Sequence, residues 1–317
     1  CIKGSILDKN IISLINDKYK ITQIYHLAAL LSSKAEHSPQ LAQDVNVNGT
    51  LKLLNLAIDQ AKKNNHTVKF FFPSSIAVYG LNGLKNKILA GKIDENQFCF
   101  PETMYGCNKL YCEHLGRYYS IYYNRLSKNY KPGLIDFRAI RFPGLISAYT
   151  LPTGGTTDYA PEMLHAAASN KLYTCFVEQN TTLPFMIMDD AIESIIKLMS
   201  TKKDKLSQMI YNVGSYSVSA IDFRNIIMKY YKNAKIEFSV DLKRQSMVDS
   251  WPEDVNFNAA MSDWNFSPKY NFENSEQTAY LYKYFNNMDI IHDGIYLSTL
   301  NDFCMTSSFN RIKLLSL

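Results

Sequence analysis

The chain has 317 residues, of which 46% are hydrophobic and 20% are charged, as in a globular protein with one large domain or two small ones. Its net charge of +5 is modest and no run of five or more basic residues occurs, so composition gives no support to nucleic-acid binding. No apolar stretch reaches about 18 residues and the start has no signal-peptide pattern, so we expect no transmembrane helix.

The six cysteines and six histidines are scattered along the chain. The cysteines form no Cys-x-x-Cys pair and no spacing typical of a zinc site, which predicts single thiols and no metal site. The chain begins with Cys1, and residues 1–8 resemble a strand end that runs directly into a helix. Because a domain rarely starts in this way, we expect that an N-terminal piece precedes this sequence.

The first half of the chain alternates helical and strand patterns. A short helix is expected over residues 8–20, and a strand over residues 21–29 that ends in the small residues Ala28 and Ala29. Later elements are an amphipathic helix that opens at residues 44–50, a strand at 68–73, a helix from 103 to about 124 and a strand at 135–141. Near-continuous apolar strands that alternate with helices predict a parallel sheet covered by helices.

After Arg141 the elements become shorter. A loop rich in Gly and Thr precedes a helix that ends near Ser169, Asp189 or Asp190 is expected to cap a helix, and Ser219 is expected to cap another. Short strands are expected at residues 173–177, 185–188, 209–213 and 236–240. No repeat or low-complexity linker occurs, so the second half is predicted to be a small lid packed on the first.

Residues 103–109 (TMYGCNK) place Tyr105 and Lys109 four residues apart at a helix start, on one face of the helix. A phenol has a pKa of about 10 and a nearby ammonium favours the phenolate, so we expect Lys109 to lower the Tyr105 pKa and Tyr105 to act as a base on an alcohol. The pattern is weak by itself, because the chain has 22 tyrosines. A surface lysine beside a half-buried tyrosine would explain it as well.

Ser75 ends a strand in the segment that leads to the Tyr105 helix. Neighbouring parallel strands bring their carboxyl ends together, so a hydroxyl, a phenol and an ammonium are expected to converge on one pocket. The small residues Ala28 and Ala29 would let a flat ligand approach the backbone, although close helix–sheet packing would explain them equally well.

This Ser–Tyr–Lys arrangement resembles that of the short-chain dehydrogenases. Four longer segments resemble the short-chain L-threonine 3-dehydrogenases of the extended, epimerase-like branch: residues 73–80 (PSSIAVYG), 141–147 (RFPGLIS), 155–160 (GTTDYA) and 249–252 (DSWP). The resemblance runs from about residue 6 to about residue 287. The last three motifs are specific to that subfamily.

The resemblance implies an α/β fold with a Rossmann-type parallel sheet that lacks its first βαβ piece. Residues 1–150 would form a partial dinucleotide-binding domain, residues 151–288 a small α+β substrate lid with some chain crossing back, and residues 289–317 a tail of unknown structure. The implied reaction is the NAD-dependent oxidation of L-threonine to 2-amino-3-ketobutyrate.

The resemblance also assigns roles to residues. Tyr105 would be the base, Lys109 would bind the nicotinamide ribose, and Ser75 would hydrogen-bond the reacting hydroxyl. Other residues that would contact the cofactor are Leu7, Asp8, Leu27, Ala28, Ala29, Asn46, Ser74, Pro143 and Leu145. The substrate pocket would be lined by Ser32, Ser75, Thr156, Thr157 and Trp251, of which Trp251 has the weakest case for direct contact.

Thr156 and Thr157 are expected at a helix start, where free N–H groups suit the substrate carboxylate. The equal alternative is that they only cap that helix.

The family's glycine-rich turn is missing from this chain. None of the 13 glycines forms a Gly-x-x-Gly-x-x-Gly motif, and the acidic residue that selects NAD over NADP is missing too. We therefore expect this chain alone to bind NAD poorly and to be inactive. We also expect the strand at residues 21–29 to form a hydrophobic sheet edge.

Two alternative functions stay open. Another extended short-chain enzyme, such as a nucleotide-sugar epimerase or dehydratase, would share the Ser–Tyr–Lys set but not the GTTDYA and DSWP motifs. A non-catalytic remnant is favoured by the missing glycine turn. The resemblance further favours a homodimer built on the helices that begin at Asn46 and Thr103, with no nucleic-acid or membrane partner. Localisation stays open between the mitochondrial matrix of a eukaryote and the cytoplasm.

Overall fold

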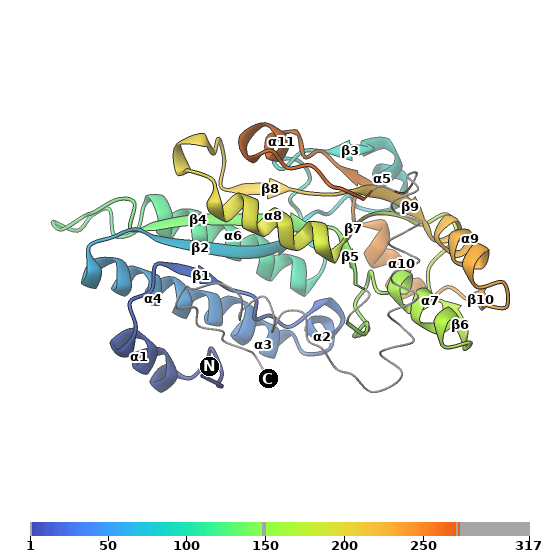
Figure 1. The fold of residues 1–317 in the computed structure, drawn as a ribbon, viewed down its shortest axis with the longest axis horizontal. Helices are drawn as coiled ribbons and strands as arrows, with labels where there is room; N and C mark the ends of the chain where they lie inside the picture. Colours follow the sequence, from blue (N-terminus) through green and yellow to red (C-terminus); the bar gives the residue numbers. More distant parts are fainter. Residues whose placement is uncertain (1, 148–149, 271, 273–317) are drawn as a thin grey trace.

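The computed structural model describes residues 2–147, 150–270 and 272. They form an α/β fold around a four-stranded parallel sheet with the strand order β1-β2-β4-β8 (Figure 1). The strands are β1 (Gln23–Tyr25), β2 (Val68–Ser75), β4 (Ile135–Phe142) and β8 (Ile210–Asn212). The predicted parallel sheet covered by helices is therefore confirmed.

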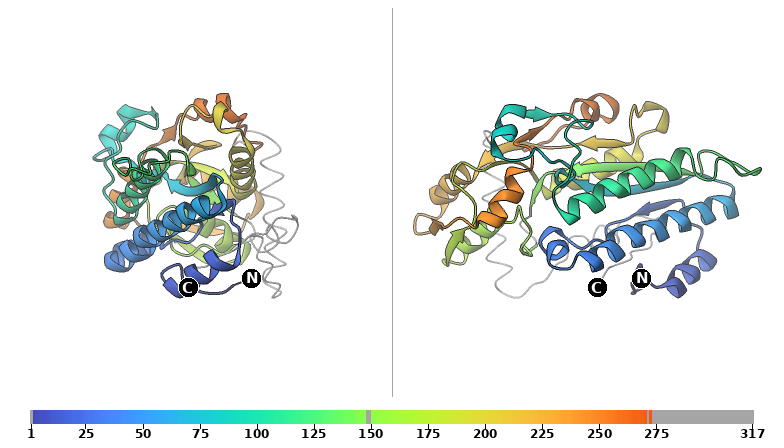
Figure 2. Two further views of the ribbon diagram at one scale, coloured as in Figure 1. Left: turned by 90° about the vertical axis from the view of Figure 1, so that its left-hand side faces the viewer. Right: turned by 180° about the vertical axis from the view of Figure 1, so that it is seen from behind.

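Helices cover both faces of this sheet (Figures 1 and 2). On one face lie α4 (Gly49–Asn64) and α6 (Met104–Ile121), and on the other lies α8 (Met188–Ser200). Successive side chains of a strand point to opposite faces. Accordingly Phe70 and Phe72 of β2 join the apolar cluster beneath α4, whereas Phe71 joins the cluster that contains Leu198 of α8. Burial on both faces explains why β2 and β4 are almost continuously apolar.

Side-chain caps fix several helix starts. Asp8 accepts a hydrogen bond from the Asn10 N–H and caps α1 (Lys9–Lys18), and Thr103 caps α6. Ser219 accepts from the Asp222 N–H and caps α9 (Ala220–Tyr230), as predicted.

The predicted cap of α8 is wrong. The helix begins at Met188, so both Asp189 and Asp190 lie inside its first turn. The buried Asp190 carboxylate instead accepts hydrogen bonds from the backbone N–H groups of Lys269 and Tyr270, at 3.0 and 3.2 Å. Asp190 therefore fixes a distant segment of the chain against α8.

Strand β1 is shorter than predicted. Only Gln23–Tyr25 form ladder pairs, all with β2, and β1 lies at one edge of the sheet as far as the chain is described. Beyond the ladder pairs, the His26 N–H also donates to the Phe71 carbonyl of β2 at 3.1 Å. The expected edge position is confirmed.

A π-helix, Gln43–Asn48, leads directly into α4 and was not predicted. It follows two short helices, α2 (Ser32–His37) and α3 (Pro39–Ala42). Single turns of π-helix often occur at functional sites, because they rotate side chains out of the regular helical order.

Residues 84–93 and the part of the chain after β4 build smaller sheets beside the carboxyl ends of β2 and β4 (Figure 1). They are β5 (Gly144–Ile146) with β7 (Thr182–Ile187) and β9 (Tyr216–Ser219), β6 (Leu172–Cys175) with β10 (Lys235–Phe238), and β3 (Lys92–Ile93) with β11 (Asp254–Val255). The helices here are α5 (Leu84–Ala90), α7 (Tyr159–Ala168), α9, α10 (Leu242–Asp249) and α11 (Asn258–Trp264).

Strand β8 returns from this part to the edge of the main sheet. The domain boundary near residue 150 stays a prediction, and the predicted tail at residues 289–317 lies outside the described residues. Within the described part, no helix is both long and apolar enough to cross a membrane.

Candidate active site

The start of α6 packs directly on the turn that follows β2. This turn is a short 3-10 helix, Ile76–Val78, which Ser75 caps by accepting a hydrogen bond from the Ala77 N–H at 3.2 Å. A Cβ on Gly106 would lie 2.0 Å from the Ala77 carbonyl oxygen, so only glycine allows this approach. The contact brings Tyr105, the neighbour of Gly106, to the end of the strand that carries Ser75.

Lys109 is buried one turn further along α6. Its ammonium donates a hydrogen bond to the Pro73 carbonyl oxygen at 2.6 Å and lies 5.3 Å from the centroid of the Tyr105 ring. It also lies 4.7 Å from the centroid of the Phe72 ring. Lys109 and Tyr105 are thus in contact at the carboxyl end of β2, where the sequence placed them with Ser75.

The predicted lowering of the Tyr105 pKa is wrong in this structure. Burial raises the pKa of the Tyr105 phenol above its usual value. Burial also lowers the pKa of Lys109 to about 8, against the opposite influence of Cys112 and Glu113. The ammonium faces the Tyr105 ring and donates to a backbone carbonyl, so desolvation of the phenol outweighs any gain from the positive charge.

His26 directly follows β1, close enough to Lys109 for the ammonium to repel its protonated ring. Burial, followed by repulsion from Lys109, lowers the pKa of His26 to about 3, so the ring is neutral near pH 7. Its Nε2 lies 2.8 Å from Thr50 Oγ1 in a hydrogen bond. A neutral, hydrogen-bonded His26 adds no second positive charge to the site.

Asn46 holds the chain that follows β1. Its side-chain oxygen accepts from the Leu30 N–H at 2.7 Å, and its amide donates to the Leu30 carbonyl at 3.1 Å and to Asn108 Oδ1 at 3.3 Å. The amide is buried in the π-helix, and these bonds fix the backbone next to the predicted cofactor residues Ala28 and Ala29. Its predicted direct contact with the cofactor stays a prediction.

The other predicted cofactor residues lie in three separate places: before α1, at β5 and near the end of β2. Leu7 and Asp8 precede α1, where the Leu7 carbonyl accepts from Lys52 Nζ at 2.6 Å. Pro143 is buried next to β5, and Leu145 is half-buried within it. The buried Ser74 hydroxyl donates to Glu113 rather than pointing freely into a cleft.

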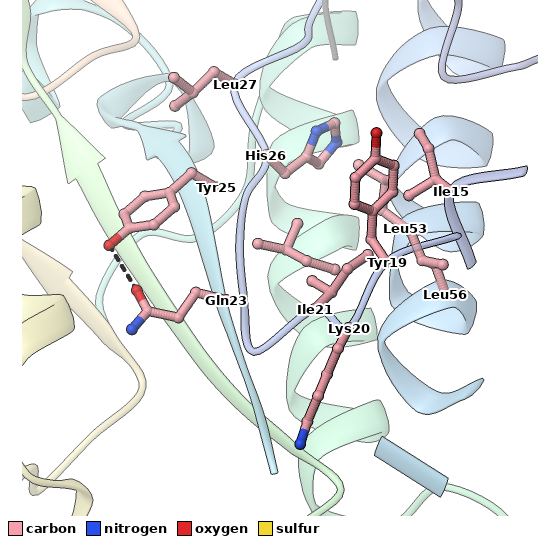
Figure 3. Close-up of a pocket in the computed structure, with 11 residues that line it drawn as sticks. Ile15, Tyr19, Lys20, Ile21, Gln23, Tyr25, His26, Leu27, Leu53 and Leu56 are labelled. Carbon is pink, nitrogen blue, oxygen red and sulfur yellow. Dashed lines mark hydrogen bonds between the residues drawn. The ribbon is translucent and has the colours of Figure 1, made fainter. Parts of the chain in front are cut away.

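A pocket lies between α1, the unpaired side of β1 and α4 (Figure 3). It is lined by Ile15, Tyr19, Lys20, Ile21, Gln23, Ile24, Tyr25, His26, Leu27, Leu53 and Leu56. Among these only Leu27 is a predicted cofactor residue, and it is 46% exposed. The pocket therefore marks the open edge of the sheet, away from Ser75, Tyr105 and Lys109, which do not line it.

Two predicted substrate residues meet across a long sequence separation. Ser32 Oγ accepts from the Thr156 N–H at 3.2 Å and lies 3.2 Å from Thr156 Oγ1. Both side chains are buried, and Ser33 Oγ donates to the Gly154 carbonyl next to them. The segment with the GTTDYA motif is therefore docked on the start of α2.

Neither threonine of this motif caps the helix that follows. The first residue of α7 is Tyr159 and its N-cap is Asp158, whose carboxylate accepts from the backbone N–H groups of Thr153 and Gly155 at 2.9 and 2.7 Å. Thr157 is half-buried. The alternative that Thr156 and Thr157 serve only as caps is therefore wrong.

Trp251 is 3% exposed and belongs to the core of the smaller sheets. Its indole Nε1 has no hydrogen-bond partner among the described residues. The preceding Ser250 carbonyl accepts from the Leu81 N–H at 2.8 Å, so Trp251 is attached to the turn-rich segment between Ser75 and Tyr105.

Three charged residues around the site were not predicted to belong to it. Glu113 and Arg141 form a buried ion pair beside Ser74. Arg244 donates to the Gly155 carbonyl at 3.2 Å and lies over the Phe176 ring. Glu113 could have been found, because it follows Lys109 by four residues on the same face of α6.

The residues present fit only one end of a dinucleotide. The buried ammonium of Lys109 and the phenol of Tyr105 are suitable donors for a ribose. The chain has no glycine turn for the pyrophosphate. Within the described residues, no group of three His, Cys, Asp or Glu side chains could hold a metal ion.

Known proteins resemble this chain over most of its length. The profile of the GDP-mannose 4,6 dehydratase family matches residues 1–130. An uncharacterized epimerase/dehydratase of Staphylococcus haemolyticus is 35% identical over 266 residues, which are 84% of this chain and 77% of that protein.

Two solved structures share the fold. A monomeric L-threonine 3-dehydrogenase from a metagenome is 36% identical with a TM-score of 0.77, over 92% of this chain and 85% of the other. The L-threonine 3-dehydrogenase of Trypanosoma brucei is 32% identical with a TM-score of 0.78, over 92% and 83%. Given the identity with the staphylococcal protein, this chain belongs to the epimerase/dehydratase family of the extended short-chain dehydrogenases.

Proposed function

We propose that this chain carries the proton-transfer and substrate-binding parts of an NAD-dependent L-threonine 3-dehydrogenase, which oxidises L-threonine to 2-amino-3-ketobutyrate. The observation that carries the proposal is that α2 joins the two parts of the site. Its Ser32 binds Thr156 of the GTTDYA segment, and its Glu36 accepts from the Met104 N–H, next to Tyr105, at 2.6 Å. The two similar solved structures, both L-threonine 3-dehydrogenases, support the choice of substrate.

The reaction removes a proton from the β-hydroxyl of threonine and a hydride from its β-carbon. Tyr105, as phenolate, would take the proton, while Ser75 Oγ would hydrogen-bond the reacting oxygen. Bound NAD would supply the hydride acceptor. The Thr156 hydroxyl would hydrogen-bond the polar end of the amino acid.

Lys109 would act as an electrostatic neighbour of Tyr105. Because burial raises the Tyr105 pKa, the phenolate needs a positive charge nearby, and Lys109 is the ammonium that the structure places against the ring.

A fusion protein tests this function. The strand–turn–helix unit with the Gly-x-x-Gly-x-x-Gly motif of a threonine dehydrogenase would be joined ahead of Cys1, and NADH formation would be followed with L-threonine. We expect turnover by the fusion, and little or none by the 317-residue chain alone, which lacks the motif. A folded fusion that binds NAD but leaves threonine unchanged would contradict the proposal.

A second candidate function is the conversion of a nucleotide sugar by an epimerase or dehydratase. The match of residues 1–130 to the GDP-mannose 4,6 dehydratase family supports it. The same fusion separates the two candidates when it is offered UDP-sugars and GDP-mannose beside L-threonine. A fusion that binds NAD and converts none of them would instead favour a non-catalytic remnant.

We also propose that the protein forms a homodimer through α4 and α6. Two exposed tyrosines, Tyr111 and Tyr118, lie on α6, and a third, Tyr122, caps its end. Aromatic residues are frequent in such interfaces. Light scattering of the purified chain would give the mass, and a monomer, as described for the metagenome enzyme, would contradict the proposal.

A further inference from the structure

A buried carboxylate connects the catalytic helix with the two central strands. Glu113 follows Tyr105 and Lys109 at intervals of four residues, so all three lie on one face of α6. Glu113 is 1% exposed, and no step of the proposed reaction uses it.

Both oxygens of Glu113 are satisfied. Oε1 accepts from the Ser74 hydroxyl at 2.5 Å and from Arg141 Nε at 2.8 Å, and Oε2 accepts from Arg141 Nη2 at 2.6 Å. Ser74 and Arg141 are direct partners in the ladder between β2 and β4. The bidentate ion pair with Arg141 of β4, together with the hydrogen bond from Ser74 of β2, fixes the position of Glu113 along the strand axis. A small shift would break both hydrogen bonds to the guanidinium.

Arg141 is itself fixed by further contacts. Its Nη1 donates to the Tyr79 hydroxyl at 2.9 Å and to the Glu95 carbonyl at 2.6 Å. Tyr79 in turn donates to Asn212 Oδ1 on β8 at 2.7 Å. The guanidinium is therefore held independently of α6 and can act as a rigid anchor for Glu113.

Two successive residues of β2 bind side chains of α6: the Pro73 carbonyl accepts from Lys109, and the Ser74 hydroxyl donates to Glu113. The next residue, Ser75, caps the turn on which Gly106 of α6 packs, next to Tyr105. Burial lowers the pKa of Lys109, and Cys112 and the Glu113 carboxylate oppose that change, so Glu113 also acts on Lys109 through its charge.

We propose that Glu113 is a positioning residue: held by Ser74 and Arg141, it sets the position of α6 along β2 and thereby holds Tyr105 and Lys109 beside Ser75. The proposal rests on the proposed function only in treating Tyr105 and Lys109 as the reacting pair.

The test is hydrogen–deuterium exchange of the full 317-residue chain carrying Glu113→Gln. We expect amides of residues 104–112 to exchange roughly tenfold faster or more, because breaking a buried ion pair is costly and the loss falls on α6. The matched control is Asp136→Asn, which breaks the other buried ion pair of β4, between Asp136 and Arg138. Arg138 binds the Leu198 and Thr201 carbonyls at the end of α8, so the control should affect residues 195–201 instead.

Unchanged exchange at residues 104–112 in Glu113→Gln, or an equal increase there in Asp136→Asn, would overturn the proposal. If Glu113→Gln does not fold, the variant Ser74→Ala tests the proposal instead. It removes the hydrogen bond from Ser74 to Glu113 and leaves the ion pair between Glu113 and Arg141 intact. We expect a smaller increase confined to residues 104–112, and no increase would overturn the proposal. Exchange needs neither substrate nor cofactor, so a failure of threonine oxidation is distinguishable from a failure of this proposal.

Discussion

The Lys109 ammonium nitrogen lies 2.6 Å from the Pro73 carbonyl oxygen, two residues before Ser75 in the same strand. A buried cation is thus attached to the backbone of β2 by a hydrogen bond to a neutral group. Such an ammonium lacks the water that would stabilise its charge, and burial lowers the Lys109 pKa to about 8. The buried charge of Lys109 therefore lowers the free energy of unfolding, and this effect can be measured.

Lys109→Met should stabilise the chain at neutral pH. The folded pKa of about 8 lies below the ordinary lysine value, so between these two values the unfolded chain binds more protons than the folded chain. The destabilisation by Lys109 therefore becomes smaller as pH rises through this range. Below pH 8 the buried ammonium is charged and costs its full penalty. We expect the free energy of unfolding to rise by about 1–3 kcal/mol at pH 7, and the gain to vanish near pH 10.5.

Denaturant unfolding at pH 7, 8, 9 and 10 checks this expectation. The matched control is Lys52→Met, since the half-buried Lys52 also donates to a carbonyl, that of Leu7. A Lys109→Met gain that does not depend on pH would show that packing, rather than charge burial, is responsible.

Tyr105→Phe should abolish turnover in the fusion protein and leave folding intact. Loss of a general base typically lowers the rate by about 10²–10⁴-fold. Because the phenol is half-buried beside an apolar cluster, the phenyl ring should fit the same space. The rate of NADH formation and the melting temperature are the measurements.

Tyr111→Phe is the control for that variant, because Tyr111 lies on the same helix and is 52% exposed. It should keep full activity. An equal loss of activity in Tyr105→Phe and Tyr111→Phe would contradict the assignment of Tyr105 as the base.

The main sheet was predictable because its signals are local. β2 and β4 are buried on both faces, so their apolar runs stand out, and the α6 start carries a Thr cap. The spacing of apolar residues and the presence of a capping residue are both visible within one short stretch of sequence. The π-helix before α4 and the three residues of β1 were not predictable, because they depend on neighbours that are distant in the sequence.

The candidate site was predictable only in its residue types. The pair Tyr105 and Lys109 follows from helical spacing, but the raised Tyr105 pKa depends on how deeply α6 is buried. Likewise, nothing in the spacing of Ser32 and Thr156 shows that they touch. Contacts across more than 100 residues are decided by packing, which one sequence does not display.

Gly106→Ala should separate α6 from the turn that follows Ser75. The new Cβ would lie 2.0 Å from the Ala77 carbonyl oxygen, a backbone atom that cannot rotate away. We expect the free energy of unfolding to fall by about 1–3 kcal/mol although alanine favours helices. Cys107→Ala, a change at the exposed neighbouring position, should be nearly neutral. Chemical unfolding of both variants checks the difference, and a stable Gly106→Ala would contradict the close packing.

Ser32→Ala should weaken substrate binding more than it slows the reaction. The buried Thr156 N–H would lose its acceptor, so the GTTDYA segment should detach from the start of α2. In the fusion protein we expect KM for threonine to rise roughly threefold to tenfold, with a smaller change in kcat. The detached segment would have to dock again on α2 when threonine binds, with the Thr156 N–H unpaired, and this cost falls equally on the substrate complex and the transition state. Ser33→Ala is the matched control, since Ser33 binds the Gly154 carbonyl and not Thr156. Initial rates over a range of threonine concentrations measure both constants. An equal rise of KM in the control would mean that the whole segment, and not the Ser32–Thr156 contact, determines binding.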